Sequence, residues 1–378
     1  MATKSSVTVV ETPAQRQPIK KTWIERVIPQ QTEDITVKWA LHSLKAISVV
    51  TLLCVGCEVW IMVNESTVRN LLNANLKSAT ADDKTALGIE ANFRVGQTYH
   101  SVFLASLIYW FVVTWDALMH ANIMQCISVN FYNAGLFIYA ILQINQTAKD
   151  LEFINTSDLS DPSLASYNSG YFFAAQLLIP IIIGLFTPVF AYLTYRMHLE
   201  FGWRQYRISG GSIKLEKVFF AYHILLLLLK YALFFVTGFT VLDLALTYVS
   251  ERGKYVIPIG AAVVGALTSA CGFYGARHEK KSLILLYIAG CVGVIGYLVD
   301  RVYDAVRRSK DPTLESDFER AKSPFLMYAA TSGVLVIASL VFGVVSYNNF
   351  NKGLKQVLDG EEKRKKGEVE AVEIDLDA

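Results

Sequence analysis

A single ammonium group interrupts a long apolar stretch of the chain, HILLLLLKYALFFVTGF at residues 223 to 239. A lysine at the centre of a membrane helix costs roughly 2.5 to 3.5 kcal/mol, so Lys230 is expected to face other helices and to have an anionic partner. Counted from Lys217, about 20 Å of helix places Lys230 past the bilayer midplane. Glu58, in CVGCEVW, lies about 25 Å along the first apolar stretch and matches that depth. The sequence therefore predicts a Glu58–Lys230 pair.

Such an intramembrane pair has two interpretations. Paired charges within spans often mark proton relays or translocation paths, so the pair could form a substrate or proton site. A buried ion pair can equally fix the register of two helices without any transport. Both interpretations stay open at the level of sequence.

Three further polar side chains are predicted inside the same bundle. His223 precedes Lys230 by seven residues, so the two share a helix face, and an interior hydrogen bond is the favoured role of this imidazole. Asn130 and Asn133 are three residues apart, which suits hydrogen bonds to a neighbouring helix. These side chains are expected to hold helices together first and to line a polar pathway second.

The composition is that of a protein that crosses a membrane several times. Of the 378 residues, 53% are hydrophobic and 18% are charged, and the net charge of +2 gives no indication of nucleic-acid binding. A span needs roughly 20 apolar residues. The expected fold class is all-α, a polytopic transmembrane helical bundle of about eight spans. The expected spans lie at about 41–63, 98–118, 122–144, 171–194, 218–243, 256–276, 282–302 and 324–347.

Short-range patterns add detail to these spans. Small residues in the sixth span and Gly290, Gly293 and Gly296 in the seventh predict close packing of these two helices. Cys54 and Cys57 form a C-x-x-C inside an apolar helix with no second pair, which favours a packing role. No metal-ligand or cofactor motif was identified, so no cofactor is expected.

Basic residues predict the topology. Lys20, Lys21 and the terminal EEKRKK place both chain ends in the cytosol. Residues 1–38 and 349–378 are expected to be disordered cytosolic tails that flank a bundle at 39–348. The loop at about 145–170 would then face the lumen or exterior, with Asn155 of NTS as the best N-glycosylation acceptor.

A cytosolic segment after the fourth span combines aromatic and basic side chains. An interfacial segment on an anionic leaflet has this mixture, although a cytosolic loop is basic for topological reasons alone. Both interpretations stay open. The residues concerned are Glu200, Trp203, Arg204, Tyr206 and Arg207.

Several of these stretches resemble one family when they are taken in order. They are DALMHANIMQCISVNFYN, EFGWRQYRISG, LLKYALFFVTGF, YGARHE and NFNKGLK. Together they are similar to the fungal family of uncharacterised Golgi apparatus membrane proteins. The resemblance implies a helical bundle in the Golgi apparatus membrane, with another endomembrane or the plasma membrane as the alternative, and it implies no activity. The chain departs from the family pattern at Ala232, where that pattern has an Asp, and near Asp243, where it has a Gln.

Two functions therefore remain in competition. The first is a non-enzymatic Golgi protein that acts in membrane organisation or cargo sorting, with the bilayer and cytosolic coat or adaptor proteins as partners. The second is a small-solute or proton-coupled transporter with a site around Lys230 and Glu58. An intramembrane enzyme is disfavoured because no catalytic dyad or paired aspartates at one depth were found.

Overall fold

The computed structural model describes residues 34–78, 83–156, 170–208, 213–250, 255–308, 315–355 and 358. Within these ranges the regular structure is long α-helices, without strands. The helices are α2 (Asp34–Ser78), α3 (Asp83–Met119), α4 (Ile123–Thr156), α5 (Gly170–Ile208), α6 (Ile213–Ser250), α7 (Val256–Arg277), α8 (Lys281–Arg308) and α9 (Glu315–Asn349).

The expected spans are confirmed. Eight of the described helices are long and apolar enough to cross a membrane, and each contains one of the predicted stretches. The second and third spans are separate helices, as predicted, and a tight turn joins α3 to α4. Ala121 has a positive φ of 48° in this turn, and Asn122 N donates to Ala117 O at 2.9 Å. The fold is therefore an all-α polytopic bundle.

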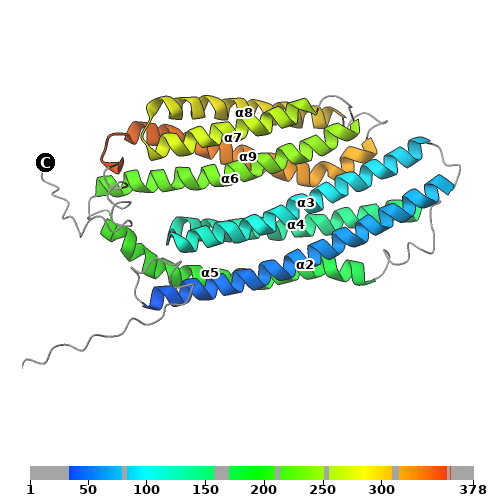
Figure 1. The fold of residues 1–378 in the computed structure, drawn as a ribbon, viewed down its shortest axis with the longest axis horizontal. Coiled ribbons are helices and arrows are strands. Elements are labelled where there is room, and N and C mark those ends of the chain that lie inside the picture. The colour runs from blue at the N-terminus through cyan, green and yellow to red at the C-terminus, as the bar shows by residue number, and fades with distance from the viewer. Residues whose placement is uncertain are drawn as a thin grey trace, which may run out of the picture.

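The eight helices form two groups of four. In the N-terminal group, α2 to α5, each helix packs on the next and α5 returns to α2; the C-terminal group, α6 to α9, closes in the same way. The two groups lie side by side in Figure 1, and they meet where α3 and α4 contact α6 and α9. The start of α2 and the end of α9 lie at the same end of the bundle (Figure 1).

Aromatic rings fill the contact between the two groups. Tyr109 of α3 stacks on Phe234 of α6 with ring centroids 4.1 Å apart, and Tyr132 of α4 stacks on Tyr231 of α6 at 5.7 Å. The hydroxyl of Tyr328 in α9 lies 2.8 Å from Ser106 Oγ. Stacked pairs contribute about 0.5–1.5 kcal/mol beyond area burial, so this contact holds the groups in one register.

Small residues bring α7 close to its neighbours. A Cβ on Gly290 of α8 would overlap Thr268 of α7, and a Cβ on Gly272 of α7 would lie 2.8 Å from Leu229 of α6 and 2.9 Å from Tyr287 of α8. The predicted tight packing of the sixth span on the seventh is confirmed at Gly290 and Gly272, whereas a Cβ on Gly293 or Gly296 would meet no atom within 4 Å, so these two glycines do not contribute to it.

Three boundaries in the structure differ from those predicted from the sequence. Helix α2 begins at Asp34, so the last residues of the predicted N-terminal tail are helical. Phe350, Leu354 and Leu358 are buried in the core, so the chain stays packed past the predicted end of the bundle at 348. Helix α4 continues to Thr156, so the loop predicted from about 145 begins later. In each case an apolar or helical segment extends beyond the length that the bilayer alone requires.

Candidate buried ionic sites

The predicted Glu58–Lys230 pair is wrong, because Lys230 has a different carboxylate. Its Nζ donates to Asp116 Oδ2 at 2.5 Å and to Gln125 Oε1 at 3.1 Å. Glu58 instead contacts His100 and Gln143 inside the N-terminal group. The Lys230 ion pair joins α6 to the α3–α4 turn and thus bridges the two groups.

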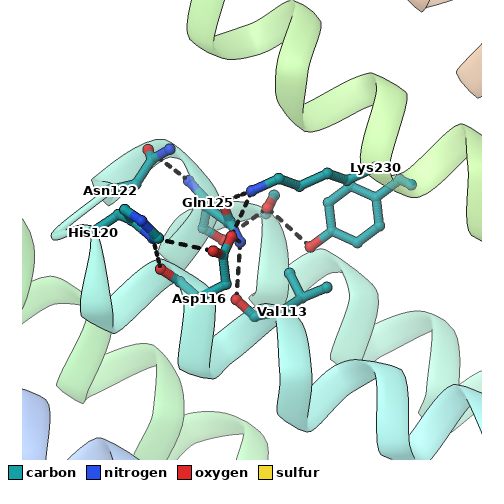
Figure 2. A network of polar contacts seen from close by, with 8 residues as sticks. Val113, Asp116, His120, Asn122, Gln125 and Lys230 are labelled. Atoms are coloured by element: carbon teal, nitrogen blue, oxygen red, sulfur yellow. Dashed lines mark hydrogen bonds and ion pairs between the residues drawn. The ribbon is translucent and has the colours of Figure 1, made fainter. Parts of the chain in front are cut away.

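Asp116 is the centre of this bridge, as Figure 2 shows. Gln125 Nε2 donates to Asp116 Oδ2 at 2.7 Å and to Val113 O at 2.9 Å. On the other side of the carboxylate, His120 Nδ1 lies 3.1 Å from Asp116 Oδ1. The side chains of Lys230 and Asp116 are 33% and 32% exposed, so water screens the pair in part. The arrangement fits a structural link better than an enclosed substrate site.

The depth argument failed because α6 extends far beyond the α3–α4 turn. Lys230 lies about 25 Å along α6 from Ile213, yet it meets the end of α3, which stops at Met119. In Figure 1 the α3–α4 turn lies beside α6 well inside the end of that helix. Lys230 is therefore level with a helix end of the N-terminal group and not with Glu58.

The new pairing predicts a specific pattern of coupling. Lys230→Met and Asp116→Asn are each expected to lower the free energy of unfolding by about 1 kcal/mol, because the pair is one-third exposed. Their effects should be non-additive when the two changes are combined. Lys230→Met and Glu58→Gln should add, since the two residues share no contact. Denaturant titration of the purified chain measures both cycles. Coupling of Lys230 with Glu58 in place of Asp116 would contradict this geometry.

Glu58 belongs to a fully buried cluster within the N-terminal group. Its Oε1 lies 2.7 Å from His100 Nδ1 and accepts from Gln143 Nε2 at 2.7 Å. Gln143 Nε2 is also close to His100 Nδ1. Glu58 is 0% exposed and His100 is 4% exposed. Three helices, α2, α3 and α4, thus contribute one polar side chain each.

A second carboxylate extends this cluster along α2. Glu65, seven residues after Glu58 on the same helix face, places Oε2 3.7 Å from His100 Nε2. The imidazole therefore lies between two buried carboxyl groups, one at each ring nitrogen. A carboxylate–imidazole–carboxylate arrangement of this kind can bind and relay protons.

The C-terminal group contains its own buried ion pair. Arg301 Nε of α8 donates to Asp243 Oδ1 at 3.0 Å and to Oδ2 at 2.9 Å. Tyr297 Oη also donates to Asp243 Oδ2 at 2.7 Å, and Arg301 Nη2 donates to Thr247 Oγ1 at 2.9 Å. The Arg301 and Asp243 side chains are 7% and 3% exposed. This network fixes α8 against α6.

The remaining predicted interior residues behave differently from one another. Asn130 Nδ2 donates to Thr194 Oγ1 at 3.0 Å, and Asn133 Nδ2 donates to Thr187 Oγ1 at 2.6 Å, so both link α4 to α5. His223 packs edge-on against Phe219, with ring centroids 4.3 Å apart. Its buried Nε2 makes no hydrogen bond to the described residues, so the interior hydrogen bond predicted there is not found.

Two predicted surface features fall where side chains are not described. The backbone of the segment with Glu200, Trp203, Arg204, Tyr206 and Arg207 continues α5 as a helix to Ile208, and its side chains lie outside the described ones. Asn155 lies in the last turn of α4 instead of a loop, and its side chain also lies outside the described ones.

Sequence reasoning predicted none of the three ionic clusters with its correct partners. The seven-residue spacing of Glu58 and Glu65 was a usable signal, because two carboxylates on one helix face indicate a shared polar neighbour. His100 lay inside the predicted second span and was not considered as a partner. Asp243 and Arg301 lie at the ends of the fifth and seventh predicted spans, and nothing in the sequence indicated that α6 and α8 contact each other.

Apolar helices that cross the bilayer with ion pairs buried between them define a polytopic helical membrane protein. Among curated proteins, the chain is similar to the UPF0658 Golgi apparatus membrane protein of Schizosaccharomyces pombe. The two are 21% identical over 277 residues, which cover 68% of this chain and 76% of the relative. This similarity confirms the resemblance to the fungal family of uncharacterised Golgi apparatus membrane proteins.

The relative and the spans together identify a multi-pass protein of the Golgi apparatus membrane. No family model matches the chain, and no solved structure matches it.

Proposed function

We propose that this chain is a non-enzymatic Golgi membrane protein that acts in membrane organisation or cargo sorting through its basic end. The observation that carries the proposal is the gathering of basic side chains at the end of the bundle where α2 begins and α9 ends. Those that are exposed there are Lys38, His42, Lys45, His198, Lys214, Lys217, Lys280, Lys281, Lys352 and Lys355.

This end is proposed to face the cytosol. Cytosolic segments next to spans carry an excess of Lys and Arg, and an anionic cytosolic leaflet attracts them by about 1 kcal/mol for each basic residue near the surface. Both chain ends would then be cytosolic, in agreement with the topology predicted from the sequence.

Aromatic side chains accompany the basic ones at the level expected for lipid headgroups. The Arg196 guanidinium lies 4.7 Å from the ring centroid of Trp39, which also contacts Tyr192 edge-on at 6.2 Å. On the other group, Lys280 Nζ lies 5.2 Å from the Tyr274 ring. Amphipathic rings and cations of this kind anchor helices at the membrane interface. A fixed basic face is a suitable contact surface for cytosolic coat or adaptor proteins.

Charge neutralisation at this end tests the proposal. We replace Lys214, Lys217, Lys352 and Lys355 by Gln in the full-length protein. Cells that express this variant are expected to retain Golgi-resident cargo as poorly as cells that lack the gene. The four corresponding Lys→Arg changes keep the charge and should retain cargo. Quantitative imaging of tagged cargo against a Golgi marker provides the measurement. Normal cargo distribution in cells that lack the gene would contradict the proposal.

A second candidate function is favoured by the buried Glu58–His100 contact. A titratable cluster inside a span is a common feature of proton-coupled transporters. The site proposed from the sequence, built round Lys230 and Glu58 together, is excluded because the two residues belong to separate clusters. Helix α5 also stays continuous through Pro180 and Pro188, unlike the broken helices of many transporters. Solute uptake driven by a proton gradient into liposomes that contain the purified chain would favour this candidate over the first.

A further inference from the structure

We propose that Glu58, His100 and Glu65 form a proton-binding site in the N-terminal group, in which the imidazole holds a proton between two carboxylates. The inference concerns proton binding alone, so it holds independently of the proposed role in sorting.

The contacts supply the geometry of such a site. His100 Nδ1 lies 2.7 Å from Glu58 Oε1, and His100 Nε2 lies 3.7 Å from Glu65 Oε2. An imidazolium carries N–H groups on both ring nitrogens, whereas a neutral imidazole carries one. Nδ1 lies within hydrogen-bond distance of Glu58, and Nε2 lies at ion-pair distance from Glu65, so a protonated ring places its positive charge beside both carboxyl groups.

The neighbouring helix leaves space for the second carboxylate. Gly96 lies four residues before His100 on α3, and a Cβ at this position would be 3.2 Å from Glu65 Oε1. The glycine therefore lets the Glu65 carboxyl approach the α3 backbone, next to the imidazole. Burial is nearly complete, with Glu58, Glu65 and His100 at 0%, 3% and 4% exposed.

Charge balance explains why a proton should stay bound. Arg69, four residues after Glu65, continues the same face of α2 and donates to Gln97 Oε1 at 3.2 Å. The two carboxyl groups bring negative charge into this buried site, and an imidazolium between them offsets part of it. A protonated imidazole is favoured there because buried charge is strongly unfavourable unless it is paired.

The other helices packed against the cluster add no further cation among the described side chains. Helix α4 contributes Tyr139 and Gln143, while α5 has no ionisable side chain between Phe173 and Val189. Among the described side chains, further ionisable groups close to the cluster include Cys54 and Cys57 of α2, Tyr99 of α3 and Tyr328 of α9.

The cluster extends along α2 away from the basic end of the bundle. Glu58 lies about 27 Å along α2 from Ala40, which packs beside the α3–α4 turn. Glu65 lies about 10 Å further in the same direction, toward the end opposite the basic one. Glu65 is thus the outer group and Glu58 the inner group of the site.

Histidine NMR of the full-length protein in lipid nanodiscs tests the proposal. The His100 signal is identified by its loss in His100→Gln. At about pH 7.5, where an ordinary histidine is neutral, we expect His100 to be an imidazolium in the wild type. We expect it to be neutral at the same pH in Glu65→Gln and in Glu58→Gln.

Asp243→Asn provides the matched control, because it removes a buried carboxylate from the other group and should leave the His100 signal unchanged. If Glu58→Gln fails to fold, Glu65→Gln alone decides the outcome. A neutral His100 in the wild type, or an imidazolium that persists in the folded glutamine variants, would overturn the proposal.

Discussion

Replacement of Arg301 by methionine is expected to lower the free energy of unfolding by about 3–5 kcal/mol, because it leaves the Asp243 carboxylate buried without its cation. Asp243 accepts two contacts from Arg301 Nε and one from Tyr297 Oη, and the substitution removes the two contacts from the guanidinium. Unfolding of the purified protein by SDS in mixed micelles, followed by circular dichroism, measures the change.

The double variant makes this prediction sharper. Asp243→Leu combined with Arg301→Met should be much less destabilised than Arg301→Met alone, since replacement of both members of a buried pair by apolar residues is often near neutral. Arg307→Met is the matched control, because Arg307 is exposed on the same helix. Wild-type stability of Arg301→Met would show that the Asp243 charge is not buried as described.

Replacement of Gly290 by leucine is expected to separate α8 from α7 and to lower the free energy of unfolding by at least about 1–3 kcal/mol. Even the first added carbon would overlap Thr268, and further atoms cannot fit between two helices in close contact. Without a hydrophobic driving force between helices in lipid, close van der Waals packing of this kind carries much of the association. The melting temperature and the monodispersity of the detergent-solubilised protein report the effect.

Gly293→Leu is the matched control for this change. Gly293 lies three residues later on the same helix, is exposed, and has no atom within 4 Å of a built Cβ. The control should therefore melt as the wild type does. Equal melting of the Gly290 and Gly293 variants would contradict the assigned packing of α7 on α8.

The stagger between the two four-helix groups gives each ionic cluster a different environment. The Asp116–Lys230 pair lies at the α3–α4 turn and is one-third exposed, whereas the Glu58 and Asp243 clusters lie inside their groups and are nearly inaccessible. We therefore expect large effects from single substitutions within a group and small effects at the bridge between the groups.

Local features of the sequence were sufficient to predict the membrane spans. Apolar length predicted eight crossings, with the second and third spans separated at about 118–122, where a tight turn joins α3 to α4. Small residues at Gly272 and Gly290 predicted close helix contacts. These features depend on residues near one another along the chain, since insertion into lipid is decided largely span by span.

The ion-pair partner of Lys230 could not be predicted from local features of the sequence. Depth along a helix was counted correctly from Lys217, but the position of α6 relative to α3 depends on where the α3–α4 turn contacts it. A shift of one helix along its neighbour changes every facing pair without any change in hydropathy. Asp116 and Glu58 were both available carboxylates, and the axial register of the helices selected Asp116.

The sequence by itself thus determined that lipid surrounds eight helices and that their buried charges need partners. Tertiary structure decided which charges meet: Asp116 with Lys230 between the groups, Glu58 with His100 in one group, and Asp243 with Arg301 in the other. The physical reason is that hydrophobicity acts span by span, whereas an ion pair forms only where packing brings two particular side chains within a few ångströms.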